Sequence, residues 1–117
     1  MSRVGAAALD LTTSLKESGV PASVVDQFVR SATSIGANYA EARGAESRAD
    51  FVHKLQTSLK EGRETKHWLD VFRHRPRMPQ RSVTTLLGEC DQLCAILYCS
   101  MVTAKTDRKG DGNGHRT

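Results

Sequence analysis

The sequence predicts an all-α protein, an up-down antiparallel bundle of four helices. Apolar residues recur at intervals of three and four over most of the chain, which is the spacing of a helix face. Glycines, prolines and capping residues interrupt this spacing at three places and divide it into four segments. At 117 residues the chain is one small domain, so its core is modest and oligomerisation is a natural source of extra stability.

The first predicted helix covers residues 3–17, and Gly19 and Pro21 mark its end. Its apolar face consists of Val4, Ala8, Leu11 and Leu15. The second predicted helix covers residues 23–43 and begins at a capping pattern, Ser23-x-x-Asp26.

Two stripes run side by side along the second helix. The apolar stripe consists of Val25, Phe28, Ala32, Ile35, Tyr39 and Ala42, and the polar stripe consists of Ser31, Ser34, Asn38 and Glu41. Polar groups beside a core need hydrogen-bond partners, so we expect the polar stripe to contact a neighbouring helix, within or between subunits. A ligand or catalytic site is the less favoured interpretation, because structural networks are commoner.

The third predicted helix covers residues 47–73. Gly44 ends the preceding helix, and Ser47-x-x-Asp50 is a capping pattern that opens this one. Its core face consists of Phe51, Leu55, Ser58, Gly62, Thr65, Leu69 and Phe72. The three middle members, Ser58, Gly62 and Thr65, form a small layer. Because Gly62 costs about 1 kcal/mol of helix propensity relative to alanine, we expect another helix to pack closely there.

A linker and a fourth helix complete the bundle, which we expect to span residues 1–104. Two prolines in residues 74–81 prevent a continuous helix. The fourth helix covers residues 82–104, with a core face made of Val83, Leu86, Cys90, Leu93, Leu97, Met101 and Ala104. Residues 105–117 are glycine-rich and polar, and we expect a disordered tail.

The chain resembles a known family between about residues 30 and 72. The run Ser34-Ile35-Gly36-Ala37-Asn38-Tyr39-Ala40-Glu41 is similar to the signature Ser-Ile-Pro-Ala-Asn-Ile-Ala-Glu-Gly of bacterial four-helix-bundle proteins. That family was first met as the product of intervening sequences in large-subunit ribosomal RNA genes. Its third helix also resembles the pattern Phe51, Leu55, Ser58, Leu59, Glu61, Glu64, Trp68 and Leu69. The accessory proteins of diversity-generating retroelements look similar.

The resemblance carries expectations about assembly and partners. It implies an up-down bundle that forms a ring, commonly of five subunits. In the retroelement branch it also implies binding to nucleic acid, RNA or DNA, and to a reverse transcriptase. Two positions depart from the family pattern. Gly36 stands where the family often has proline, and this change affects an expected helix kink. Ala42 stands where the family often has glycine, and the turn is therefore expected at Gly44.

The excess positive charge of the chain, +4 overall, is concentrated in the linker and the tail. Residues 73–81 contain no Asp or Glu and hold the four linker arginines, Arg73, Arg75, Arg77 and Arg81. One interpretation is solubility and favourable charge at a helix C-terminus. The other is contact with phosphates, repeated in each subunit of a ring. The monomer sequence leaves both open.

The sequence contains no catalytic constellation, and we expect neither an enzyme nor a cofactor. Glu64-x-x-His67 has the spacing of a di-iron bundle, but such sites need two copies of this motif. Cys90 and Cys94 lie one helical turn apart without the further ligands that a zinc site needs, so we interpret them as buried, reduced core residues.

The three cysteines, Cys90, Cys94 and Cys99, form no disulfide framework, and residues 1–9 lack a full signal-peptide pattern. No apolar run is long enough to span a bilayer. We therefore expect a cytoplasmic protein without a membrane partner. Two functions remain: a nucleic-acid-binding accessory ring that uses the linker arginines, or a structural module that binds another protein.

Overall fold

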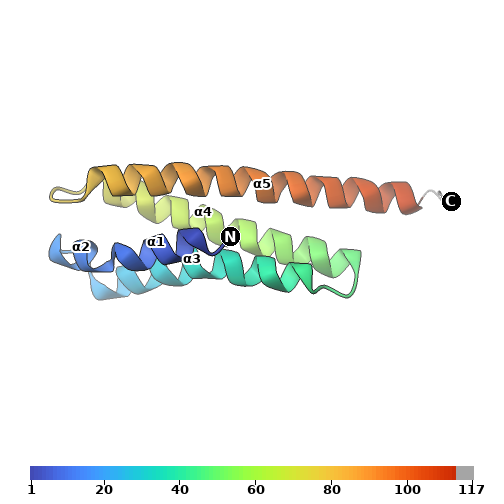
Figure 1. Cartoon of the computed structure of the whole chain (residues 1–117), viewed down its shortest axis with the longest axis horizontal. Coiled ribbons are helices and arrows are strands. Elements are labelled where there is room, and N and C mark those ends of the chain that lie inside the picture. The colour runs from blue at the N-terminus through green and yellow to red at the C-terminus, as the bar shows by residue number, and fades with distance from the viewer. Residues whose placement is uncertain (113–117) are drawn as a thin grey trace.

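The protein is a bundle of helices in the order α1 (Arg3–Asp10), α2 (Thr12–Glu17), α3 (Ala22–Arg43), α4 (Arg48–Arg73) and α5 (Gln80–Gly112). The computed structural model describes the backbone of residues 1–112 and the side chains of residues 1–106. Within residues 1–112 there is no strand. Figure 1 shows α1 and α2 running together in one direction and α3, α4 and α5 alternating after them. The predicted all-α, up-down antiparallel bundle is confirmed.

The first predicted helix, residues 3–17, is wrong as a single element, because it is interrupted at Leu11 between α1 and α2. The Leu11 N–H bonds to the Ala8 carbonyl, three residues back, at 3.1 Å. The Thr12 hydroxyl donates to the Leu9 carbonyl at 2.9 Å. A side chain that bonds the backbone in this way competes with helical hydrogen bonds, and the chain tightens there.

The starts of α3 and α4 differ in their capping. Ser47 Oγ accepts the Asp50 N–H at 3.0 Å, as the capping pattern predicts. The predicted cap at Ser23 is wrong, because α3 begins at Ala22 and Pro21, without a side-chain hydrogen bond, occupies the cap position. The fixed φ of proline suits the entry to a helix, so no serine cap is required. Despite Gly36, α3 continues without interruption to Arg43.

The last helix is longer than the sequence suggested. α5 begins at Gln80 and continues to Gly112, eight residues past the predicted end at residue 104. The prediction of a disordered tail is therefore wrong for residues 105–112, and residues 113–117 lie outside the described part. Neither a proline nor a glycine follows Ala104 until Gly110, and a polar composition alone does not end a helix.

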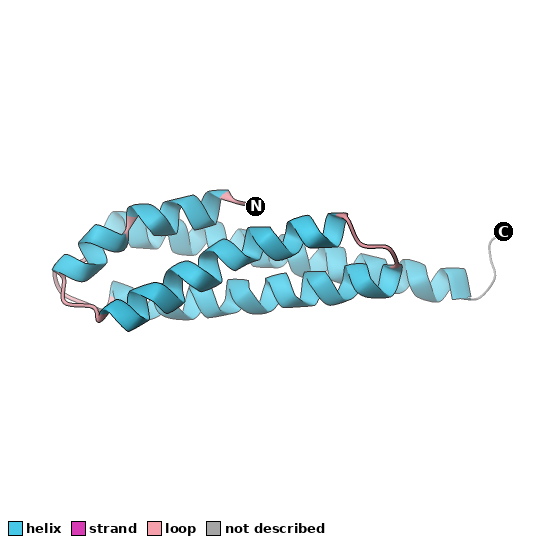
Figure 2. Ribbon diagram, turned by 90° about the horizontal axis from the view of Figure 1, so that it is seen from below, coloured by secondary structure: helices cyan, strands magenta, loops and turns pink. Residues whose placement is uncertain are grey.

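The fourth arm of the bundle, α1 with α2, covers only part of its length. The chain begins near the middle of the long helices and runs toward the end where α4 joins α5 (Figures 1 and 2). A side chain at Gly36 would lie 3.4 Å from Met1 atoms, so the N-terminus rests on the middle of α3. Beyond this point α3, α4 and α5 continue as three helices. No helix in the described residues is long and apolar enough to cross a membrane.

The small layer of α4 lies between α3 and α5, and all three of its side-chain positions are buried. Ser58 Oγ donates to the Ile35 carbonyl of α3 at 2.7 Å, and Thr65 Oγ1 donates to Ser31 Oγ at 3.0 Å. Gly62 faces α5, where a Cβ would lie 2.7 Å from Cys94 Sγ. That distance is shorter than any normal contact, so only glycine fits without movement.

We predict that Gly62→Leu and Gly88→Leu have opposite effects on stability. Leucine at Gly62 overpacks the α4–α5 contact and should lower the free energy of unfolding by about 1–3 kcal/mol. A Cβ at Gly88, also within a helix, meets nothing within 4 Å. Leucine there should gain up to about 1 kcal/mol of helix propensity. Urea denaturation of the two variants measures both changes.

A third variant locates the clash. Replacing Cys94 with alanine removes the sulfur atom that opposes a side chain at position 62, so Gly62→Leu should cost less in that background. Equal costs in both backgrounds would show that the two positions do not share this space.

Candidate nucleic-acid interface

The four linker arginines gather at one end of the bundle, where α4 joins α5 and α2 joins α3 (Figure 1). Arg73 is the last residue of α4, Arg75 and Arg77 belong to the connection between the helices, and Arg81 is the second residue of α5. All four are exposed. The structure thus brings these residues to one end of the molecule but gives them different surroundings.

Arg73 and Arg75 already have partners. Arg73 Nη2 lies 2.7 Å from Asp70 Oδ1, an exposed ion pair one turn back on α4. Arg75 Nη2 donates to the Ser18 carbonyl at 2.8 Å, where α2 ends. A cation at the C-terminal end of a helix is favourable, so Arg75 holds the connection between α4 and α5 against α2. Sequence reasoning missed this role, because the two residues are 57 positions apart.

The side chains of Arg77 and Arg81 have no hydrogen bond or ion pair to any other described residue. Arg77 has φ 65°, in the left-handed region that residues other than glycine rarely occupy. This conformation reverses the chain between the two prolines. The two guanidinium groups are therefore the unpaired positive charges of the linker.

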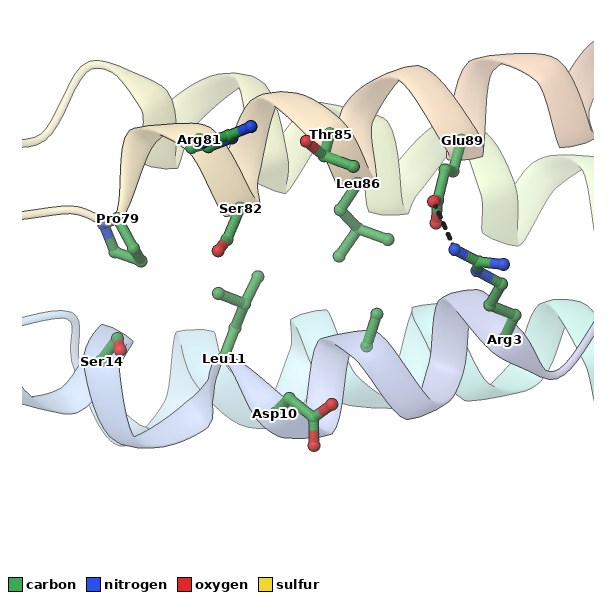
Figure 3. A pocket seen from close by; sticks show the side chains of 11 residues that line it. Arg3, Asp10, Leu11, Ser14, Pro79, Arg81, Ser82, Thr85, Leu86 and Glu89 are labelled. Atoms are coloured by element: carbon green, nitrogen blue, oxygen red, sulfur yellow. Dashed lines mark hydrogen bonds and ion pairs between the residues drawn. The ribbon is translucent and has the colours of Figure 1, made fainter.

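Two adjoining grooves lie beside these arginines and share Ser14 and Pro79 in their walls. The larger groove, about 480 Å³, separates α1 and α2 from the start of α5 (Figure 3). Arg81 belongs to its lining, and Arg77 belongs to the lining of the smaller groove, about 410 Å³. Each of the two arginines thus lines one of two adjoining grooves that share Ser14 and Pro79.

Ion pairing limits how far this positive surface extends. At the far end of the larger groove Arg3 Nη2 lies 3.1 Å from Glu89 Oε2, across the space between α1 and α5 (Figure 3). Asp10 belongs to the same groove, and Glu17 to the smaller one. Within these two grooves the unpaired positive charge therefore lies at the linker end, beside the positive end of the α5 helix dipole.

The polar stripe of α3 does not form one network. Ser31 is buried, donates to the Phe28 carbonyl at 2.9 Å and accepts the bond from Thr65. Glu41 is exposed and pairs with Lys54 of α4 at 2.7 Å. Between them Asn38 Nδ2 donates to the Ser34 carbonyl of its own helix at 2.9 Å, and both side chains are half-buried. The two ends of the stripe therefore fasten α3 to α4.

A second contact between α3 and α4 engages Glu64, the first residue of the Glu64-x-x-His67 pattern. The Arg30 guanidinium bonds Glu61 at 3.2 and 3.3 Å and both oxygens of Glu64 at 3.0 Å. The hydrogen bond to Glu61, followed by the one to Glu64, is the main cause that raises the pKa of the Arg30 guanidinium. Trp68 Nε1 donates to Glu64 at 3.4 Å. Within the described residues no three His, Cys, Asp or Glu side chains converge as a metal site would require.

The cysteines occupy two environments. Cys99 is exposed, whereas Cys90 and Cys94 are buried, and all three are free thiols. A hydrogen bond from Cys90, helped by the charges of Lys66 and Arg63, lowers the pKa of Cys94 to about 7. The hydrogen bond to Cys94 and burial raise the pKa of Cys90. The two thiols therefore differ, because proton loss is easier at Cys94 than at Cys90.

Comparisons with known proteins match most of the bundle to a protein family and to a solved structure. Residues 4–99 match the model of the family described as 23S rRNA-intervening sequence protein. A similar fold occurs in the crystal structure of a protein of unknown function from the S23 ribosomal protein family of Bacteroides thetaiotaomicron. The two chains are 28% identical, the match covers 84% of this chain and 97% of that one, and the TM-score is 0.70. No protein with a curated description matches the chain. The family match spans most of the bundle, and the chain belongs to the family of 23S rRNA-intervening sequence proteins.

Proposed function

We propose that this protein is a non-enzymatic, oligomeric accessory protein that binds nucleic acid through the linker end of its bundle. The single observation that supports this most is the pair Arg77 and Arg81. Their guanidinium groups are exposed and unpaired among the described residues, and they line two adjoining grooves. Membership of a family named for a ribosomal RNA insert makes RNA the first ligand to test.

The four linker arginines have unequal parts in this proposal. A planar guanidinium holds a phosphate through two hydrogen bonds, and Arg77 and Arg81 are free to do so. Arg73 is also available, because an exposed ion pair such as that with Asp70 contributes only about 0–1 kcal/mol. Arg75 instead acts mainly by holding the linker against Ser18.

Assembly into a ring would multiply these contacts. Two or three phosphate contacts per subunit give weak binding, whereas copies held together raise the effective concentration of each further contact. The surface of α5 supports self-association, because Ile96, Tyr98 and Val102 are 56%, 51% and 41% exposed. Ile96 also lines a groove of about 290 Å³ together with Met1 and Val4, at the start of α1. A pentamer is the assembly that the family resemblance favours, with a reverse transcriptase as the protein partner in the retroelement branch.

A second candidate function is a module that binds another protein and has no role with nucleic acid. The observation in its favour is that Arg73 and Arg75 are already engaged within the chain, which leaves a smaller positive surface than the sequence suggested. The exposed apolar residues of α5 would then contact a different protein. The two functions differ in how they respond to salt and to removal of the free arginines.

We predict that the double variant Arg77→Gln/Arg81→Gln loses most binding to single-stranded RNA and to duplex DNA, measured by fluorescence anisotropy at low salt. The matched control is Arg43→Gln/Lys60→Gln, which removes the same charge from exposed positions away from the linker. The control should bind as the unchanged protein does. The log–log salt slope should fall by roughly 0.7–0.9 for each phosphate that the double variant no longer neutralises.

Two results would contradict this function. Absence of binding by the unchanged protein at low salt would leave the protein-interaction module in its place. An equal decrease in the double variant and in the control would show that only net charge matters, and that the linker end has no special part.

We predict that the protein is a homo-oligomer, most consistently a pentamer, at micromolar concentration. Light scattering should then give a mass about five times the 12.8 kDa of the chain. Ile96→Glu should reduce this mass and preserve the helical circular dichroism, because it places a charge on an exposed apolar position of α5. Ala95→Glu, a neighbouring exposed position, is the control and should leave the mass unchanged. A monomer mass for the unchanged protein would end the ring proposal.

A further inference from the structure

Cys90 and Cys94 lie one turn apart on α5, and both direct their sulfur atoms at the same residue of α4. Cys90 Sγ lies 3.4 Å from the Gly62 carbonyl oxygen. Cys94 Sγ occupies the space that a side chain at position 62 would need, 2.7 Å from the place of its Cβ. Two thiols therefore converge at a buried point between two helices.

A disulfide between these two residues does not fit a continuous α5. Side chains one helical turn apart have Cβ atoms about 5–6 Å apart, whereas a disulfide needs about 3.5–4.5 Å. Forming the bond would require α5 to unwind across the contact with Gly62. The helix is regular there, and both thiols are free. Within the folded bundle the two thiols are therefore not bridged to each other.

The surroundings also exclude the usual zinc geometry. A structural zinc site takes four ligands, and in the described residues no third His, Cys, Asp or Glu joins the two cysteines. What remains is a pair of soft sulfur donors with no hard ligand. Thiolates of this kind select Cu(I), a soft ion with a filled d shell that accepts two sulfur ligands.

We propose that Cys90 and Cys94 form a two-thiolate binding site for a soft monovalent cation of the Cu(I) class. Binding replaces two S–H bonds with two S–Cu bonds and releases two protons to solvent, without a change of oxidation state. The site then carries one net negative charge. Arg63 and Lys66 of α4 act on Cys94 electrostatically and offset that charge, and Lys66 is positioned by its ion pair with Asp91 of α5 at 2.7 Å.

Gly62 contributes to this proposed site because it has no side chain. Any larger residue would compete with Cys94 Sγ for the same space. The glycine thus lets both sulfur atoms lie against the α4 backbone. The third cysteine, Cys99, is exposed and lies outside the α4–α5 contact, so it supplies an internal control.

The test is titration of the full, reduced chain with Cu(I) under anaerobic conditions, in competition with a chromogenic chelator. The unchanged protein and Cys99→Ser should each bind one Cu(I) per chain. Cys90→Ser and Cys94→Ser should each bind it at least about 100-fold more weakly, because even outer partners of metal ligands cost 10–100-fold when removed. The melting temperature should rise with Cu(I) in the first two proteins and not in the last two.

Several outcomes would overturn the site. No uptake of Cu(I) by the unchanged protein would do so directly. Loss of binding in Cys99→Ser, or unaltered binding in both Cys90→Ser and Cys94→Ser, would place the ion elsewhere. If Cys90→Ser fails to fold, Cys94→Ser and Cys94→Ala decide the question, because Cys94 is less completely buried than Cys90. Retained tight binding in both of these would contradict the proposal.

Discussion

The close approach of α4 to its two neighbours at the small layer is the constraint on which the rest of the bundle depends. Gly62 brings the α4 backbone against α5, and Ser58 bonds directly to a carbonyl of α3. Larger residues, Leu55 and Leu69, fill the layers on either side and are fully buried. The ring of Phe72 packs edge-on against Phe28 at the linker end, with centroids 5.1 Å apart. Because large side chains lie on both sides of the small layer, the three long helices can pack in only one register along the bundle axis.

Much of this arrangement was predictable, because an apolar spacing of three and four residues specifies which face of a helix is buried. α3 and α4 carry that spacing without interruption, and their core faces follow it. The break at Leu11 was not predictable from spacing, since the apolar positions of the first arm stay in phase across it. The length of α5 was not predictable from composition, because a polar, glycine-rich stretch suggests disorder even where no stop signal follows Ala104.

The candidate interface was predictable as a location but not as a set of contacts. Nine residues with four arginines and no acid mark the connection between α4 and α5 from sequence alone. Which guanidinium is occupied depends on residues that folding brings near, such as Ser18 at the end of α2. The same holds for Arg30, whose two glutamate partners lie 31 and 34 positions away on the next helix. Contacts between helices decide which charges stay available to a ligand, and spacing along one helix does not report them.

The short first arm has a consequence for how the chain acquires its structure. α3, α4 and α5 each pack against the next element in sequence, so their contacts close short loops and carry a low entropic cost. α1 packs mainly against α3 and less extensively against α5, which lies beyond the α3–α4 hairpin in sequence. The three long helices therefore supply the early, local part of folding. Because the first arm makes fewer contacts with the rest of the bundle, we expect it to dock last and to open at the lowest free energy.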